Sequence, residues 1–86
     1  MPGRVTVLAF AGARDVLGVG ELTVPLALLG EPLTAGRVVS WLCEEHPDLM
    51  PYRSSIRLAV NGSYVPEDEP VHDGDEVALI PPVAGG

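Results

Sequence analysis

The residues best suited to chemistry stand at the end of the sequence, where Gly85 and Gly86 carry the terminal carboxylate. Glycine has no Cβ, so a diglycine passes through a narrow channel and adopts positive φ without strain. A carboxylate is a poor electrophile until ATP converts it to an acyl-adenylate, from which a nucleophile displaces AMP. These residue types indicate acyl activation at Gly86 by a separate enzyme. The alternative is that the diglycine is only a frayed terminus.

The residues just before the diglycine favour a projecting tail. An apolar strand over residues 77–80 leads into Pro81 and Pro82, followed by Val83 and Ala84. Proline has no amide proton and fixes its own φ, so strand pairing should end there. Six extended residues span roughly 20 Å. We therefore expect a folded domain over 1–80 and an extended tail over 81–86, in which residues 81–84 set reach and direction.

Composition limits the kinds of partner. The 86 residues form one domain with a modest core, and 47% are hydrophobic, as in globular proteins. The formal charge is −7 and lysine is absent. Nucleic acid and anionic membranes require clustered basic residues, so we expect neither as a partner. A basic protein surface is the natural match, although acidity also simply confers solubility.

No catalytic or metal-binding motif stands out. Phosphate-binding loops, nucleophile elbows and dinucleotide fingerprints are missing, so we expect no catalysis by this chain alone and no metal site. Cys43 and His46 are three residues apart, but a helical cysteine is more often a small core residue than a ligand. A single cysteine, no apolar run of about 20 residues and no signal-peptide core predict a cytoplasmic protein.

Periodicity predicts a two-layer α+β domain. Thr34 is the expected N-cap of one helix that stops at His46, before Pro47. Asn61-Gly62 predicts a tight hairpin. Residues 12–18 read as a loop or single helical turn, 28–32 as a linker and 48–55 as irregular. Alternating apolar residues predict a mixed sheet of four to five strands, at residues 4–10, 21–26, 56–60, 63–66 and 77–80.

The face of this sheet turned away from the helix is expected to be apolar. Facing the helix, we expect Val5, Val7, Ile56, Leu58, Val77 and Leu79. The outward positions are then Leu8, Phe10, Ala59 and Ile80, joined by Tyr64. Such a patch indicates a protein partner, although single exposed apolar residues are normal. Arg14 is expected to orient the contact or to reach an acidic group of the partner.

Three segments resemble the MoaD family, the small sulfur-carrying subunits of molybdopterin synthase. Residues 73–86 are similar to the family's ending, with Pro-Pro-x-x-Gly-Gly as the most specific part, and Ala59-Val60-Asn61 fits the residues before its central hairpin. Residues 7–15 resemble the first strand and the Phe-Ala-x-x-Arg-Glu turn, with Asp15 in place of Glu. The resemblance covers essentially the whole chain.

The resemblance implies a β-grasp, or ubiquitin-like, fold and a pathway. An adenylating enzyme of the MoeB (E1-like) type uses ATP and Mg²⁺ on Gly86, a sulfur donor protein makes the thiocarboxylate, and no cofactor stays bound. The carrier then docks on a large, MoaE-like catalytic subunit in a heterotetramer and gives sulfur to cyclic pyranopterin monophosphate. Gly85 supplies clearance, and the partner supplies the acid–base groups. A thiamine-pathway sulfur carrier, a ubiquitin-like modifier and a structural adaptor remain as alternatives.

Overall fold

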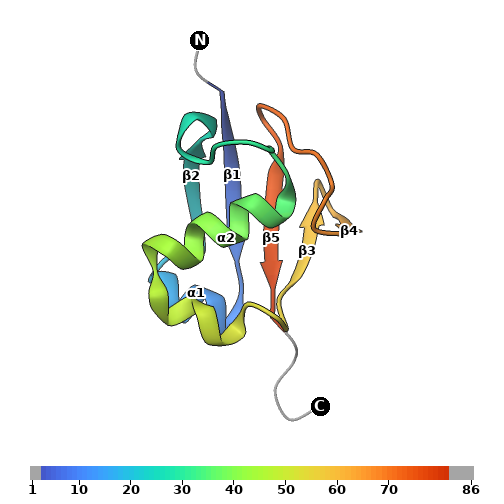
Figure 1. The fold of residues 1–86 in the computed structure, drawn as a ribbon. Helices are drawn as coiled ribbons and strands as arrows, with labels where there is room; N and C mark the ends of the chain where they lie inside the picture. Colours follow the sequence, from blue (N-terminus) through green and yellow to red (C-terminus); the bar gives the residue numbers. More distant parts are fainter. Residues whose placement is uncertain (1–2, 82–86) are drawn as a thin grey trace.

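Five strands form one mixed sheet, and the longest helix crosses one of its faces (Figure 1). The computed structural model describes residues 3–81. The strand order is β2-β1-β5-β3-β4. The first and last strands are parallel at the centre, and the other neighbours are antiparallel. The α+β prediction is therefore confirmed, with strands β1 (Arg4–Ala9), β2 (Glu21–Pro25), β3 (Arg57–Val60), β4 (Ser63–Val65) and β5 (Glu76–Ile80).

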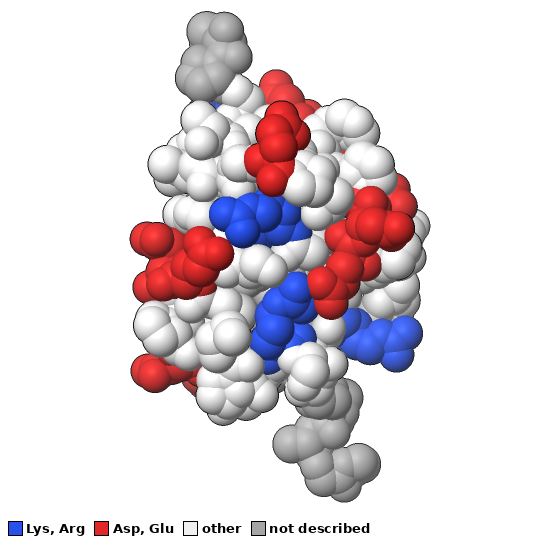
Figure 2. Space-filling model, in the orientation of Figure 1, with Lys and Arg blue, Asp and Glu red and all other residues white. Residues whose placement is uncertain are grey.

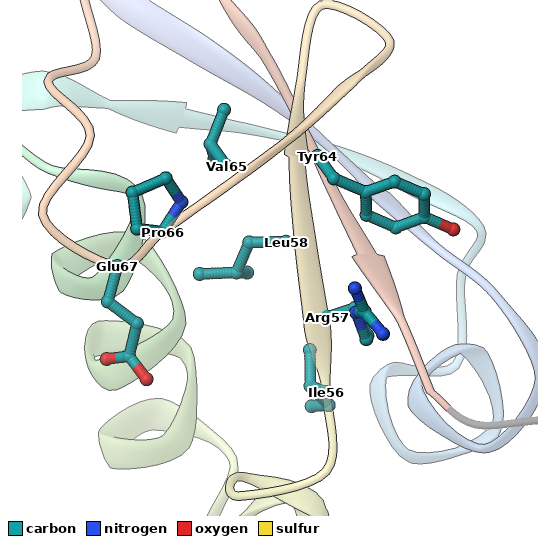
Figure 3. A pocket seen from close by; sticks show the side chains of 7 residues that line it. All are labelled: Ile56, Arg57, Leu58, Tyr64, Val65, Pro66 and Glu67. Atoms are coloured by element: carbon teal, nitrogen blue, oxygen red, sulfur yellow. The ribbon is translucent and has the colours of Figure 1, made fainter.

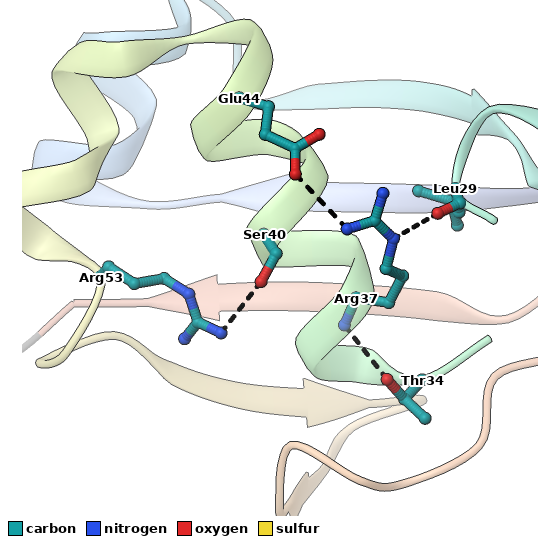
Figure 4. A network of polar contacts seen from close by, with 6 residues as sticks. All are labelled: Leu29, Thr34, Arg37, Ser40, Glu44 and Arg53. Atoms are coloured by element: carbon teal, nitrogen blue, oxygen red, sulfur yellow. Dashed lines mark hydrogen bonds and ion pairs between the residues drawn. The ribbon is translucent and has the colours of Figure 1, made fainter. Parts of the chain in front are cut away.

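The long helix α2 (Ala35–Glu45) begins and ends where the sequence predicts. Thr34 is extended, and its Oγ1 accepts a hydrogen bond from the Arg37 N–H at 3.1 Å, which satisfies one of the free amides of the first turn. His46 is the C-cap, immediately before Pro47. Arg37 also ties the helix to its surroundings, because its guanidinium donates to the Leu29 carbonyl and to Glu44 (Figure 4).

The segment between β4 and β5 closes over the start of α2. The Gly36 N–H donates to the Glu67 carbonyl at 2.8 Å, and the Ala35 N–H donates to the Glu69 carbonyl at 2.9 Å. A Cβ on Gly36 would lie 2.9 Å from that Glu67 oxygen, closer than real Cβ atoms come. Glycine is thus needed here for close backbone approach, a role that helix propensity does not reveal.

The core lies between α2 and the sheet. Val5, Val7 and Ala9 are buried in β1 and alternate with more exposed residues, as a half-buried strand requires. The predicted inward positions are buried in β3 and β5, and Ile56 packs partly buried against them. The helix contributes Val38, Val39, Leu42 and Cys43, together with Ala35 at its start.

Three connections are more regular than the sequence suggests. Residues expected to be a loop or single turn form helix α1 (Ala11–Leu17). The second strand stops at Pro25, and a 3₁₀ turn η1 (Leu26–Leu28) follows, which places Leu29, expected in a linker, fully in the core. Residues expected to be irregular contain η2 (Pro47–Tyr52), anchored by buried Leu49. In each case tertiary burial of one apolar side chain supplies what local propensity lacks.

Candidate functional site

The candidate site begins where β5 ends. This strand lies between β1 and β3, and its last residue, Ile80, pairs with Arg57. Pro81 is the last described residue, and it is buried although we expected it to start the projecting tail. The predicted roles of Pro82, Val83, Ala84, Gly85 and Gly86 fall outside the described residues. What the structure describes is therefore the surface around the end of β5.

One row of side chains crosses the outward face of the sheet. Strand register places Leu8 beside Ala78, Ala78 beside Ala59, and Ala59 beside Tyr64. Tyr64 is 64% exposed, whereas Ala59 is only 5% exposed. Exposure of Ala59 was therefore wrongly expected, because this small side chain lies between its neighbours in the row. We call the surface of this row, with Ile80 and Phe10, the outward patch.

Phe10 stands at the edge of the outward patch, at the end of β5. The parallel register of β1 and β5, continued one residue past the Ala9–Leu79 pair, sets Phe10 beside Ile80. Its ring is 48% exposed. The next residue, Ala11, has φ of 48°, in the left-handed region that costs an L-residue roughly 1 kcal/mol. The chain thus turns sharply at Phe10 into α1, which leaves the ring outside the core.

Arg14 lies one helical turn beyond Phe10. Its N–H donates to the Phe10 carbonyl at 3.3 Å, and its guanidinium lies against Gly20, where a Cβ would meet Nε at 3.5 Å. The side chain is exposed, and within residues 3–81 no carboxylate lies within ion-pair distance of it. Arg14 thus presents a positive charge beside Gly20, four residues after Phe10 in the sequence.

Arginine side chains have different partners on the two faces of the sheet. On the face that carries α2, basic side chains lie among groups of acidic side chains (Figure 2). There Arg53 contacts Glu67 at 2.6 Å and also donates to Ser40 (Figure 4). The Arg53 hydrogen bonds hold the pKa of the Glu67 carboxyl below its usual value. On the outward patch, the Arg57 guanidinium lies 5.1 Å from the centre of the Tyr64 ring, a cation–π distance.

Asn61, in the Ala59-Val60-Asn61 segment, has a structural role that sequence reasoning missed. Asn61 and Gly62 form the predicted turn, with φ of 51° and 89°. The Asn61 side chain also accepts from the Glu76 N–H at 2.9 Å and donates to Asp75 at 3.0 Å. The hydrogen bond from the Asn61 amide holds the pKa of Asp75 below its ordinary value, with further help from the His72 N–H. The sequence offers one signal for this contact: Asp75 stands directly before the last strand, fourteen residues after Asn61.

The remaining candidate residues belong to the body of the protein. Cys43 is buried, and this burial raises the pKa of its thiol. Among residues 3–81, His, Cys, Asp and Glu side chains do not gather in threes as a metal ion would need. Helices in this part of the chain are all too short or too polar to cross a bilayer.

A central parallel strand pair, a crossing helix and three antiparallel strands, β2 on one side of the pair and β3 and β4 on the other, define the β-grasp, or ubiquitin-like, class of fold. The sequence profile of the ThiS family matches residues 7–86. Curated relatives match over nearly their full length, and they are molybdopterin synthase sulfur carrier subunits. The chain belongs to the ThiS family, among these sulfur carrier subunits.

The similarities extend over both sequence and structure. The Aedes aegypti subunit is 41% identical, over 96% of this chain and 89% of the relative. The Mycobacterium tuberculosis subunit is also 41% identical, over 96% of this chain and 98% of the relative. The crystal structure of SAMP1 from Haloferax volcanii, a small archaeal modifier protein, superimposes with a TM-score of 0.81 at 28% identity, over 98% and 100% of the two chains. Sequence thus favours a sulfur carrier, while the fold is shared with a modifier.

Proposed function

We propose that this chain carries sulfur for molybdenum cofactor biosynthesis on the carboxyl group of Gly86. An E1-like enzyme of the MoeB type uses ATP and Mg²⁺ to form the acyl-adenylate and releases pyrophosphate. A sulfur donor protein then supplies the nucleophile that displaces AMP, and the terminus becomes a thiocarboxylate. We propose that the carrier works in the cytoplasm.

The charged carrier acts inside a partner. It docks on a large, MoaE-like subunit through the outward patch, and its tail enters that subunit's active site. There the thiocarboxylate gives its sulfur to cyclic pyranopterin monophosphate. A dithiolene needs two sulfurs, so two charged carriers are consumed for each product. The acid–base groups belong to the large subunit, so this chain is a sulfur donor and not a catalyst on its own.

The observation that carries this proposal is the position of β5. The strand ends at Ile80, beside Phe10, on the face of the sheet that also carries Tyr64, and the Pro81-Pro82 pair and the diglycine follow it in the sequence. Exposed aromatic residues next to the departing chain are suited to a protein interface, where such residues supply much of the binding energy. The 41% identity to sulfur carrier subunits points to the same assignment.

The test is the mass of the intact protein isolated from its native cell. We expect a fraction in which one oxygen of the terminal carboxyl is replaced by sulfur, and alkylation of the thiocarboxylate should label that fraction only. Incubation with the large subunit and cyclic pyranopterin monophosphate should return it to the carboxylate form. A lysine-linked conjugate in place of the sulfur form would identify a protein modifier instead. Sulfur that supports thiazole formation only would identify a thiamine-pathway carrier.

A further inference from the structure

Arg57 lies directly opposite the root of the tail. It pairs with Ile80 in the antiparallel ladder between β3 and β5, and such partners hold their side chains about 5 Å apart on the same face. The outward patch on which the large subunit is proposed to dock includes Ile80. A subunit docked there covers the neighbouring Arg57 and removes water from it.

Arg57 differs from the arginines on the opposite face in its partners. Arg37 pairs with Glu44 and Arg53 with Glu67. Within residues 3–81, Arg57 has no carboxylate within 4.0 Å, and its contact is with the face of the Tyr64 ring. A guanidinium over a ring still has N–H groups along its edge to donate. Covering this charge without an acceptor would be strongly unfavourable, so the covering protein must supply one.

A hollow of about 340 Å³ opens beside Arg57, at the edge of the sheet (Figure 3). It exists because β4 pairs with β3 only as far as Val65, and the chain then leaves the sheet at Pro66. Leu58 and Val65 lie on one side of the hairpin, while Arg57 and Tyr64 lie on the other (Figure 3). The hollow therefore begins at the outward patch and continues around the sheet edge onto apolar side chains, which include Ile56.

The acid at the rim of the hollow does not satisfy Arg57. Glu67 lines the hollow, but both of its carboxylate oxygens are bound by Arg53, at 2.6 and 3.0 Å. The hollow thus offers apolar walls and an arginine with free donors. A fitting occupant is a large apolar side chain with a carboxylate next to it.

We propose that the large subunit of the synthase places a carboxylate on Arg57 and inserts a large apolar side chain into the hollow beside it. This proposal rests on the proposed function, since it concerns the protein that takes the tail. The proposal also predicts that the surface of the partner that faces Arg57 is acidic. The net charge of −7 favours a basic partner overall, whereas the root of the tail requires an acidic group.

Charge reversal tests the carboxylate. Isothermal calorimetry should show that Arg57→Glu binds the large subunit about 30-fold more weakly or worse, because it sets two like charges together. Arg57→Met should keep the packing of the aliphatic side chain, but its affinity for the large subunit should depend less on salt concentration. The matched control is Arg4→Glu, which changes net charge equally at the far end of the same face and should stay within about threefold of the unmodified chain. Thermal unfolding checks that each variant is folded.

Methyl NMR tests the hollow independently. With the carrier labelled at its Ile, Leu and Val methyl groups, unlabelled large subunit should give intermolecular NOEs to Ile56 and Val65. Missing NOEs at both methyls, or an Arg57→Glu affinity within threefold of the unmodified chain, would overturn this inference while leaving the proposed function in place. If the unmodified chain failed to bind the large subunit at all, the docking part of the proposed function would fall and this inference with it.

Discussion

Asn61 and Asp75 lie fourteen residues apart and are joined side chain to side chain, with Asn61 Nδ2 donating to Asp75 Oδ1 at 3.0 Å. The same amide accepts from the Glu76 N–H at 2.9 Å, and the Asn61 N–H donates to the Glu76 carbonyl at 2.9 Å. The turn between β3 and β4 is thereby attached to the first residue of β5. The strand that carries the tail is held at its start by one side chain in the hairpin.

Replacing Asn61 by alanine should destabilise the fold by about 2 kcal/mol. The change removes the partners of Asp75 and of the Glu76 N–H, and it places alanine at a φ of 51°. Urea unfolding measures the effect. Ser63→Ala, an exposed change in the same hairpin, should shift the free energy of unfolding by less than about 0.5 kcal/mol. An equally small effect of Asn61→Ala would show that the contact is not stabilising.

Acid stability should depend on Asp75. Its folded pKa is lowered, first by the Asn61 amide and then by the His72 N–H. The carboxylate therefore stabilises the fold above the unfolded pKa of about 3.9, and this contribution is lost as pH falls through the lower folded value. Asp75→Asn should show a smaller loss of stability below about pH 4, measured by urea midpoints across pH. The loss is reduced and not abolished, because the lowered pKa of Glu67 acts in the same direction.

The control for the acid experiment is Glu45→Gln, which removes an exposed carboxylate of α2 that has no hydrogen-bond partner within residues 3–81. It should keep the acid dependence of the unmodified chain. If Asp75→Asn and Glu45→Gln lost stability equally below about pH 4, the Asp75 contacts would not contribute to the acid dependence of folding.

Two glycine-to-alanine changes in helices should have opposite signs. Gly36→Ala forces a Cβ to within 2.9 Å of the Glu67 carbonyl, and we expect a loss of about 1–3 kcal/mol. Gly12→Ala in α1 places its Cβ 3.6 Å from the Tyr52 ring, an ordinary contact. Helix propensity should then stabilise the fold by up to about 1 kcal/mol. Denaturant unfolding of both variants checks the pair, and equal effects would contradict the close approach at Gly36.

A charge on the outward patch should weaken binding to the large subunit. Phe10→Glu and Ile80→Glu each bury an unpaired carboxylate at the interface, so we expect at least a 30-fold loss of affinity, about 2 kcal/mol. Leu28→Glu is the control, since Leu28 is 54% exposed in η1, after the far end of β2. Calorimetry that gave the three variants equal affinity would place the interface elsewhere.

Deleting Gly86 should separate chemistry from folding. The truncated chain is one residue shorter, so its terminal carboxyl group does not reach the reactive position in the activating enzyme. Thiocarboxylate formation should therefore be abolished. The denaturant midpoint and the affinity for the large subunit should change little, because residues 3–81 contain the core and the outward patch. Loss of folding in this variant would mean that the terminus packs against the body. Extension by one alanine is a useful control for chain length at the same site.

Sequence reasoning succeeded where one local rule dominates. Thr34 and Pro47 bound the helix through capping and steric exclusion, and Asn61-Gly62 fixes the hairpin through positive φ. It failed where distant segments decide. The burial of Leu29, the close approach of Gly36 to Glu67 and the hollow beside Arg57 all depend on residues that folding brings together. The outward patch lies between these cases. The alternation of residues predicts which side chains point outward, but only the order of the strands in the sheet shows which of them are neighbours.

The placement of β5 between β1 and β3 has a mechanical consequence. Tension applied through the residues that follow Ile80 acts along the central strand, parallel to two hydrogen-bonded ladders that flank it. The ladders are loaded in shear, so many hydrogen bonds must break together instead of one after another. We therefore expect the domain to stay folded when the chain after Ile80 is pulled.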